Sequence, residues 1–140
     1  MLVGLPGSGK STWLARQGIV GISSDWIRQV LADDATDQTI HARVFLTMRY
    51  LLRHRLAIGR PVSYLDATHL TPDERRPYIQ IGQWYGCDVE ALFFDVPLEV
   101  CLERNLRRDR VVPDDAMARM AAKLVAPDVA EGFTKVTVVA

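Results

Sequence analysis

The strongest constraint on this chain is a glycine-rich segment close to its first residue. Residues 4–12 read GLPGSGKST, which matches the phosphate-loop pattern G-x-x-x-x-G-K-[ST] at every fixed position. The pattern predicts function only between a strand and a helix, and the apolar pair Leu2-Val3 and the helical stretch from Ser11 provide both. The residues expected to bind a nucleotide are Gly4, Pro6, Gly7, Ser8, Gly9, Lys10, Ser11 and Thr12.

The residue types in this segment point to a nucleoside triphosphate with a metal ion. Glycines let the backbone turn tightly and direct several N–H groups at an anion, and the following helix presents its positive end to the same anion. Lys10 is expected to contact the β- and γ-phosphates, and the Ser11 hydroxyl is expected to bind Mg²⁺. We therefore expect ATP and Mg²⁺ as cofactors.

The remaining residues alternate short apolar runs with helical stretches, which is typical of βαβ units around a parallel sheet. Strands are expected at residues 2–3, 19–24, 62–65, 89–94 and 136–139. Helices are expected at residues 11–17 and 26–31, and a long helix is expected to end at about residue 58. Three further helices are expected to begin at a Thr71 capping box, at Pro97 and at Pro113. The fold class is thus α/β: a single three-layer α/β/α domain over residues 1–140, of the P-loop NTPase-type kinase kind, with a helical lid at about residues 104–125.

Asp25 follows the second predicted strand, at the edge of the sheet where α/β proteins bind ligands. A carboxylate there can accept the proton of an acceptor hydroxyl during in-line phosphoryl transfer. Arg28 comes one helical turn later and is a candidate for binding an acceptor phosphate or stabilising the transferring group. The alternatives are that Asp25 only caps the short helix and that Arg28 is a solvated surface residue.

A second carboxylate, Asp66, ends the third predicted strand. We interpret it as a residue near the metal ion or the acceptor, with hydrogen bonds in the turn toward Thr68 as the alternative. His69 is expected to be a polar loop residue rather than a second base.

Residues 104–110 contain four arginines and follow a predicted helix. Kinases close lids over the nucleotide, and lid arginines neutralise charge on the transferring phosphoryl group. Arg104 and Arg108 are the preferred candidates for this role. The alternative is a solvated helix end, where cations are favourable in any case.

Bulk properties narrow the class further. The formal net charge is zero, so no whole-molecule attraction to nucleic acid is expected, although a local basic cleft is compatible with it. No run is long and apolar enough to span a bilayer, and Met1 leads directly into the phosphate loop, so we expect no membrane span, no signal peptide and a cytoplasmic location. Cys87 and Cys101 show neither metal nor disulfide spacing and are expected to be buried.

With these residues in hand, the chain resembles the 5′-hydroxyl polynucleotide kinase family, and most of all the kinase module of bacterial RNA end-healing polynucleotide kinase-phosphatase enzymes. The resemblance rests on residues 4–12, 23–25 with Arg28, 33–34, 37–39, 65–68, 101–105, 110–111 and 131–133. It implies that Lys10 and Ser11 bind ATP and Mg²⁺, that Asp25 is the general base and that Arg28 contacts a phosphate near the acceptor. It also implies that the lid over the nucleotide contains Arg104, Arg108 and Arg110.

The chain departs from this family at two places. The family often has asparagine where this chain has His69, and the lid looks one residue shorter before Asp109-Arg110. A phosphatase or ligase partner module, as in the end-healing enzymes, is not found in residues 1–140.

Three functions stay open from the sequence. The leading one is transfer of the ATP γ-phosphate to the 5′-OH end of RNA or DNA. The second keeps this chemistry but uses a sugar, a nucleoside or an antibiotic as acceptor, which zero net charge and small size favour. The third is a nucleotide-dependent switch or ATPase module, against which the Asp25–Arg28 pair argues, because a hydrolase needs no base placed for an acceptor hydroxyl.

Overall fold

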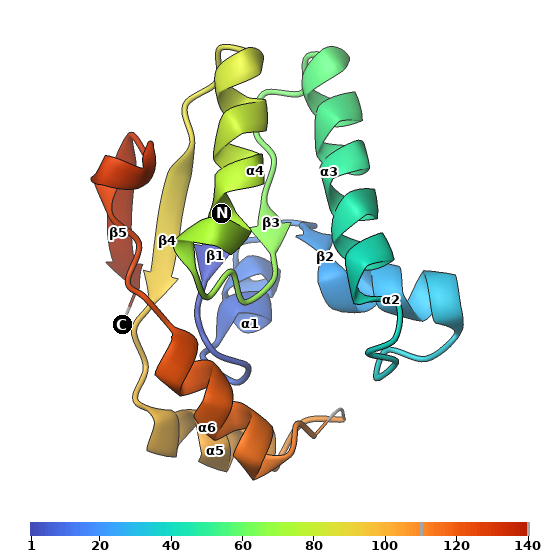
Figure 1. The fold of residues 1–140 in the computed structure, drawn as a ribbon, viewed down its shortest axis with the longest axis vertical. Coiled ribbons are helices and arrows are strands. Elements are labelled where there is room, and N and C mark those ends of the chain that lie inside the picture. Colours follow the sequence, from blue (N-terminus) through green and yellow to red (C-terminus); the bar gives the residue numbers. More distant parts are fainter. Residues whose placement is uncertain (110, 140) are drawn as a thin grey trace.

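The computed structural model describes residues 1–109 and 111–139, and Figure 1 shows a central set of strands with helices around it. The strands are β1 (Leu2–Val3), β2 (Ile22–Ser23), β3 (Leu65–Asp66), β4 (Glu90–Phe94) and β5 (Lys135–Val139). The helices are α1 (Lys10–Arg16), α2 (Ser24–Ala32), α3 (His41–Ala57), α4 (Pro72–Trp84), α5 (Leu98–Asn105), α6 (Asp114–Lys123) and the short 3₁₀ helix η1 (Val129–Glu131).

All strand pairs are parallel and form two hydrogen-bonded ladders. One ladder has the order β1-β4-β5 and the other pairs β2 with β3. The ladders meet where β3 lies beside β1, and there the Gly4 N–H donates to the Thr68 carbonyl at 3.0 Å. The spatial order is therefore β2-β3-β1-β4-β5, so that β3 separates the strand before Asp25 from the strand before the phosphate loop.

Alternating residues of the strands bury the two faces of the sheet, as the period of two requires. On one face Val3 and Phe93 pack against α3 and α4, through a cluster that includes Val44 and Met48. The buried positions of α3 are Val44, Met48 and Leu52, which are spaced by four and therefore share one face of the helix. On the other face Leu14 of α1 packs against Leu2 and Phe94. These faces give the three layers and confirm the predicted fold class.

A third apolar cluster lies beyond the carboxyl ends of the strands and attaches the lid segment to the loops. It joins Leu5 of the phosphate loop and Leu70 to Cys101 of α5 and Met117 of α6. Figure 1 shows α5 and α6 below the sheet, on the side of the phosphate loop. The predicted burial is therefore correct for Cys101, whereas Cys87 is exposed.

Two predicted strands are longer than the observed ones. Residues 19–24 reduce to β2 at Ile22–Ser23, and residues 62–65 shift to β3 at Leu65–Asp66. The apolar residues that suggested longer strands lie in exposed loops, since Val20 is 98% and Val62 is 58% exposed. Single exposed apolar residues are common on protein surfaces, so they mislead a count of apolar positions.

Helix caps set the observed helix starts. The Ser23 hydroxyl accepts a hydrogen bond from the Trp26 N–H at 3.2 Å, so α2 begins two residues earlier than predicted. The Thr71 hydroxyl likewise accepts from the Glu74 N–H at 3.2 Å, as the predicted cap requires. The Glu74 carboxylate accepts from the N–H of Leu70 at 2.8 Å, one residue before the reciprocal position of a capping box.

The segment predicted as a helical lid is a loop followed by a helix. The described residues 106–109 and 111–113 form turns and a loop between the end of α5 and the start of α6. Fully buried Asn105 ties its two ends together, since its Nδ2 donates to the Val112 carbonyl at 2.6 Å and its Oδ1 accepts from the Val112 N–H at 3.0 Å. No helix in the described part of the chain has the length and apolar character needed to cross a membrane.

Candidate nucleotide and acceptor site

The phosphate loop wraps the N-terminus of α1 in the geometry that its glycines allow. Gly7 and Gly9 have positive φ angles of 81° and 99°, which side chains other than glycine rarely adopt. A Cβ added at Gly7 would lie 2.8 Å from the Cys101 carbonyl oxygen, because the loop lies directly against α5. The loop therefore requires glycine at this position for its contact with α5 as well as for its turn.

Lys10 is buried inside the loop that it follows. Its Nζ donates to the carbonyl oxygens of Gly4 at 2.9 Å and Leu5 at 2.8 Å. Burial lowers the pKa of Lys10 to about 8, and nearby Arg108 lowers it further while Asp66 opposes the shift. The ammonium group is thus still protonated at neutral pH and provides a fixed positive charge at the loop, as a polyphosphate site needs.

Ser11 and Asp66 come together from α1 and β3. The Ser11 hydroxyl donates to Asp66 Oδ2 at 2.9 Å. Burial raises the pKa of the Asp66 carboxyl, and the hydrogen bond from Ser11 and the charge of Lys10 oppose the shift. A hydroxyl and a carboxylate beside a phosphate loop are the hard oxygen ligands that Mg²⁺ takes, together with phosphate oxygens and water. The pair therefore fits the expected metal site.

Asp25 lies in the first turn of α2, next to the phosphate loop. Ser23 provides the helix cap, so the alternative in which Asp25 serves only as the cap is wrong. Asp25 Oδ1 is 3.6 Å from Nη1 of Arg28, and its side chain is 45% exposed. The carboxylate is thus held beside a cation and remains accessible to a substrate.

Arg28 is 4% exposed, so it is not a solvated surface residue. Its Nη2 lies 3.3 Å from Nδ1 of His41 at the start of α3. Burial and the charge of Arg28 lower the pKa of His41, so its imidazole is neutral at physiological pH. Arg28 therefore connects the carboxylate of Asp25 to the first turn of α3.

Two of the predicted lid arginines reach the phosphate loop. Nη2 of Arg108 lies 3.9 Å from Asp25 Oδ2, and its buried Nη1 has no hydrogen-bond partner among residues 1–109 and 111–139. Nη1 of Arg104 lies 3.8 Å from the position that a Cβ atom would occupy at Gly9, so this guanidinium is next to the phosphate loop. Arg110, the third arginine assigned to the lid by resemblance, lies outside the described residues.

All these groups line one cavity of about 1470 Å³ at the carboxyl ends of the strands. Of the described residues that line it, nine are lysines or arginines and four are aspartates or glutamates. The chain as a whole has no net charge, so its positive charge is concentrated in this cavity. The sequence analysis missed several lining residues: Phe45, Arg49, Arg119, Met120 and Lys123. A search for polar residues spaced by four beside the apolar stripe of α3 could have found Arg49.

His69 is a loop residue, as predicted, and the structure adds that it is buried. It is 2% exposed, has a φ angle of 47°, and its Nδ1 lies 2.6 Å from the Leu2 carbonyl oxygen. Because a carbonyl can only accept, Nδ1 is assigned as the donor. Burial lowers the pKa of His69 to about 3, so the imidazole is neutral at physiological pH. The residue supports the loop after β3 and is not an exposed polar residue.

A buried arginine that sequence reasoning missed fixes this same loop. Arg75 of α4 is 0% exposed. It donates to both carboxylate oxygens of Glu131, from Nε at 2.8 Å and from Nη2 at 3.0 Å. Its Nη1 donates to the carbonyl oxygens of His69 at 2.8 Å, Leu70 at 3.3 Å and Val125 at 3.0 Å. Arg75 thus joins the loop after β3 to the segment that follows α6.

Comparison with known proteins assigns the chain to a family. A family model described as an AAA domain matches residues 1–127, which is most of the chain. The chain belongs to this AAA-domain family. The matched residues include the phosphate loop, Asp25, Asp66, the lid segment and α6.

The chain is also similar to two curated kinases. It is 34% identical over 80 residues to the L-seryl-tRNA(Sec) kinase of Homo sapiens, which covers 56% of this chain and 23% of that protein. It is 33% identical over 73 residues to the L-seryl-tRNA(Sec) kinase of Mus musculus, with 51% and 20% covered. The match spans about a fifth of the length of these relatives. The comparisons support a P-loop, kinase-type enzyme domain and do not single out polynucleotide 5′-hydroxyl kinases.

Proposed function

We propose that this domain transfers the γ-phosphate of ATP, with Mg²⁺, to a hydroxyl at the end of a nucleic acid, and that the 5′-OH of RNA or DNA is the acceptor. The observation that carries the proposal is the position of Asp25. Its half-exposed carboxylate lies between Arg28 and Arg108 at the rim of the phosphate loop. A P-loop protein that only hydrolyses a nucleotide has no need of a carboxylate between two arginines facing an acceptor.

The donor half of the site would hold the triphosphate. The N–H groups of the phosphate loop and the N-terminus of α1 would bind its oxygens, and Lys10 would contact the β- and γ-phosphates. Ser11 and Asp66 would hold Mg²⁺, which when bound neutralises negative charge on the phosphates.

The acceptor half would position and deprotonate the hydroxyl. Asp25 would accept the proton as the acceptor oxygen forms its bond to the γ-phosphorus and the bond from that phosphorus to the β–γ bridging oxygen breaks, releasing ADP. Arg28 would bind a phosphate next to the acceptor hydroxyl. Arg108 and Arg104 would stabilise charge on the transferring group, and the buried Nη1 of Arg108 gives this residue an N–H available for a phosphate oxygen.

The basic cavity favours a polyanionic acceptor over a small metabolite. A sugar, nucleoside or antibiotic would leave many of the cavity's cations without a counter-charge. The names of the two relatives favour a second candidate, in which the acceptor hydroxyl belongs to a seryl group carried by a transfer RNA.

A single assay separates these functions. The protein is incubated with γ-labelled ATP, Mg²⁺ and one acceptor at a time: a 5′-OH RNA, a 5′-OH DNA, a seryl-tRNA or a metabolite panel. Label in a 5′-OH oligonucleotide is the expected result, and an oligonucleotide with a 5′-phosphate is the matched control. Label only in seryl-tRNA or in a metabolite would contradict the 5′-OH assignment. Free phosphate as the sole product would contradict any transferase.

A further inference from the structure

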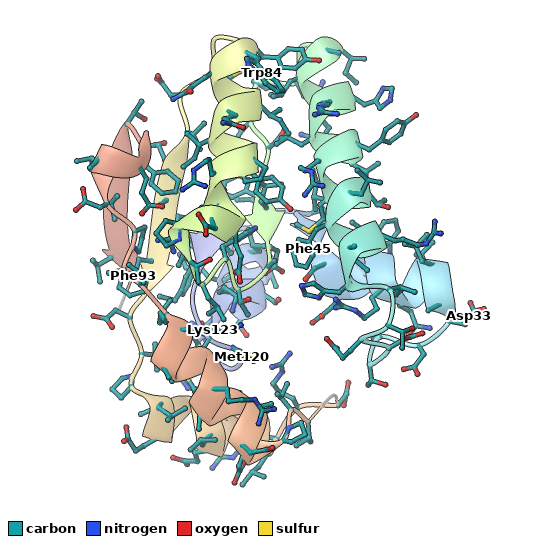
Figure 2. All side chains as sticks on the ribbon, viewed as in Figure 1. Asp33, Phe45, Trp84, Phe93, Met120 and Lys123 are labelled. Atoms are coloured by element: carbon teal, nitrogen blue, oxygen red, sulfur yellow. The ribbon has the colours of Figure 1, made fainter. Side chains whose placement is uncertain are left out.

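Part of the cavity is lined by residues of α3 and α6 rather than by the phosphate loop. We call it the α3–α6 arm and define it by Phe45 and Arg49 of α3 and by Met120 and Lys123 of α6, all of which line the cavity. Figure 2 shows Phe45 on α3, and Met120 and Lys123 on α6, on the two sides of this arm. None of these residues has a role in the proposed transfer of the phosphoryl group.

The wall formed by α3 combines aromatic rings with a cation. His41, Phe45 and Arg49 follow one another at a spacing of four and therefore share one face of the helix. The rings of His41 and Phe45 lie 4.7 Å apart with a tilt of 56°. Phe45 is half-buried and packs against the core, so its ring is a fixed surface. Because Arg28 contacts His41, this aromatic surface begins next to the acceptor end of the site.

The wall formed by α6 supplies a second cation. Lys123 is exposed in the last turn of the helix and lines the same cavity as His41, which the carboxylate of Glu74 also lines. Arg119, one turn earlier, forms an ion pair with Asp115 at 3.0 Å. A lysine in the last turn of a helix also interacts favourably with the helix dipole. That interaction alone would not require the side chain to lie in the cavity. Its position in the lining of the cavity makes it available to a ligand as well.

We propose that the α3–α6 arm binds the nucleotide that follows the acceptor end of a single strand. The base would stack on Phe45 beside His41, and the phosphate beyond it would lie between Lys123 and Arg49. Proteins that bind single strands combine a positive groove with aromatic side chains in this way. This inference rests on the proposed function. It predicts that the enzyme prefers acceptor strands of two or more nucleotides over a single nucleotide.

The test compares two acceptors, a nucleoside 3′-phosphate and a trinucleotide with a 5′-OH. The measured quantity is the ratio of their kcat/KM values. For the wild type we expect a preference for the trinucleotide of about 5-fold or more, since one stacked base contributes about 1–3 kcal/mol. Phe45→Ala and Lys123→Gln are each expected to reduce this ratio at least about 3-fold. Phe45→Leu keeps most of the packing volume and removes the ring, so it serves if Phe45→Ala is poorly folded.

Matched controls lie on the same or neighbouring elements outside the arm. Leu46 is exposed on α3, and Lys135 is exposed at the start of β5, and neither lines the cavity. Leu46→Ala and Lys135→Gln are expected to keep the wild-type ratio. Lys123→Gln, in contrast to Lys135→Gln, should also reduce the slope of log Kd against log salt for the trinucleotide by about 0.7, the value for one phosphate contact on a single strand.

The results separate this inference from the function on which it rests. A wild type that phosphorylates both acceptors with equal kcat/KM overturns the α3–α6 arm and leaves the proposed function intact. A length preference that persists in both Phe45→Leu and Lys123→Gln also overturns it. A wild type that binds ATP and phosphorylates no nucleic-acid acceptor overturns the proposed function, and this inference with it.

Discussion

Two pairs of an arginine and a carboxylate lie on either side of the loop after β3, and they differ in almost every respect. Arg75 and Glu131 meet through two hydrogen bonds of 2.8 and 3.0 Å, and their side chains are 0% and 14% exposed. Arg108 and Asp25 approach only to 3.9 Å, with side chains 32% and 45% exposed. The first pair closes a junction between segments, whereas the second borders the cavity.

The difference separates a guanidinium that is part of the framework from one that we propose to bind phosphate. All three nitrogen atoms of Arg75 donate hydrogen bonds to protein oxygens. Arg108 has a buried Nη1 without a partner among the residues that the structure describes. A buried donor left without a partner costs about 1–3 kcal/mol. Such a cost is reasonable where a bound phosphate supplies the acceptor.

The largest expected effect comes from the carboxylate of the second pair. Asp25→Asn keeps the shape of the side chain and removes its basicity, so kcat for transfer should fall about 10²–10⁴-fold. Steady-state kinetics with labelled ATP and a 5′-OH oligonucleotide measures this. The free energy of unfolding should change by less than about 0.5 kcal/mol, as for other exposed positions. A loss of only a few-fold in kcat would contradict the role of base.

The first pair should respond in the opposite way. Arg75→Gln leaves the Glu131 carboxylate without its partner, so we expect a loss of about 3 kcal/mol in the free energy of unfolding, the lower end for a broken buried pair. Urea denaturation followed by circular dichroism measures this loss. The double variant Arg75→Met/Glu131→Met tests the cause, because removing both charges should recover part of the stability. Equal stability of Arg75→Gln and the wild type would show that the pair has no structural role.

Arg108→Ala is the matched change on the cavity side. We expect kcat to fall about 100-fold, because one preorganised donor to the developing charge is lost. The urea midpoint should stay near the wild-type value, and Arg107→Ala serves as a control on the same loop. A stability loss as large as that of Arg75→Gln would remove the distinction between the two arginines.

The buried imidazole of His69, in the loop after β3, should make the free energy of unfolding depend on pH. Its pKa falls from 6.5 to about 3 on folding, so the unfolded chain binds one more proton between these values. The contribution of His69 to the free energy of unfolding is therefore fully present above pH 6.5. It decreases by about 1.4 kcal/mol for each unit by which the pH is lowered within this window. His69→Asn should flatten the dependence between pH 6 and 4.5, measured by urea unfolding, since asparagine tolerates the positive φ. An unchanged slope would contradict the buried neutral imidazole.

The smallest effect is expected for the exposed ion pair between Arg76 and Asp73, which is as short as the buried pair between Arg75 and Glu131. Nη1 of Arg76 lies 2.8 Å from Asp73 Oδ1, but these side chains are 59% and 83% exposed. Arg76→Ala should cost about 0.3–0.5 kcal/mol in the free energy of unfolding, because solvent screens the pair. Comparison with Arg75→Gln in the same assay isolates the effect of burial at equal distance. A loss near 3 kcal/mol would mean that distance, and not burial, determines the contribution.

The phosphate loop and the fold class could be predicted from sequence because their signals are local. The pattern from Gly4 to Thr12 fixes a strand, a loop and a helix, and the alternation of apolar runs predicts a parallel sheet. The proximity of Ser11 and Asp66 could also be predicted, because the carboxyl ends of parallel strands lie at the same edge of a sheet.

The Arg75 junction could not be predicted in this way. Arg75 and Glu131 are 56 positions apart in the chain, and Arg75 sits in the polar part of a helix where an exposed arginine is the ordinary expectation. The burial of His69 could not be predicted either, because this loop residue is covered only by the approach of Leu2 from β1. The walls of the α3–α6 arm also depend on helix packing, which spacing alone does not supply.

The hydrogen bonds between Asn105 and Val112 bear on the entropy cost of binding a ligand. They join the two ends of the segment that carries Arg107 and Arg108, so its backbone has fewer conformations available than an open loop of the same length. Ordering a loop at a binding site costs free energy, and a segment that is already restricted has less to lose. The two hydrogen bonds should therefore favour ligand binding, although Asn105 itself does not line the cavity.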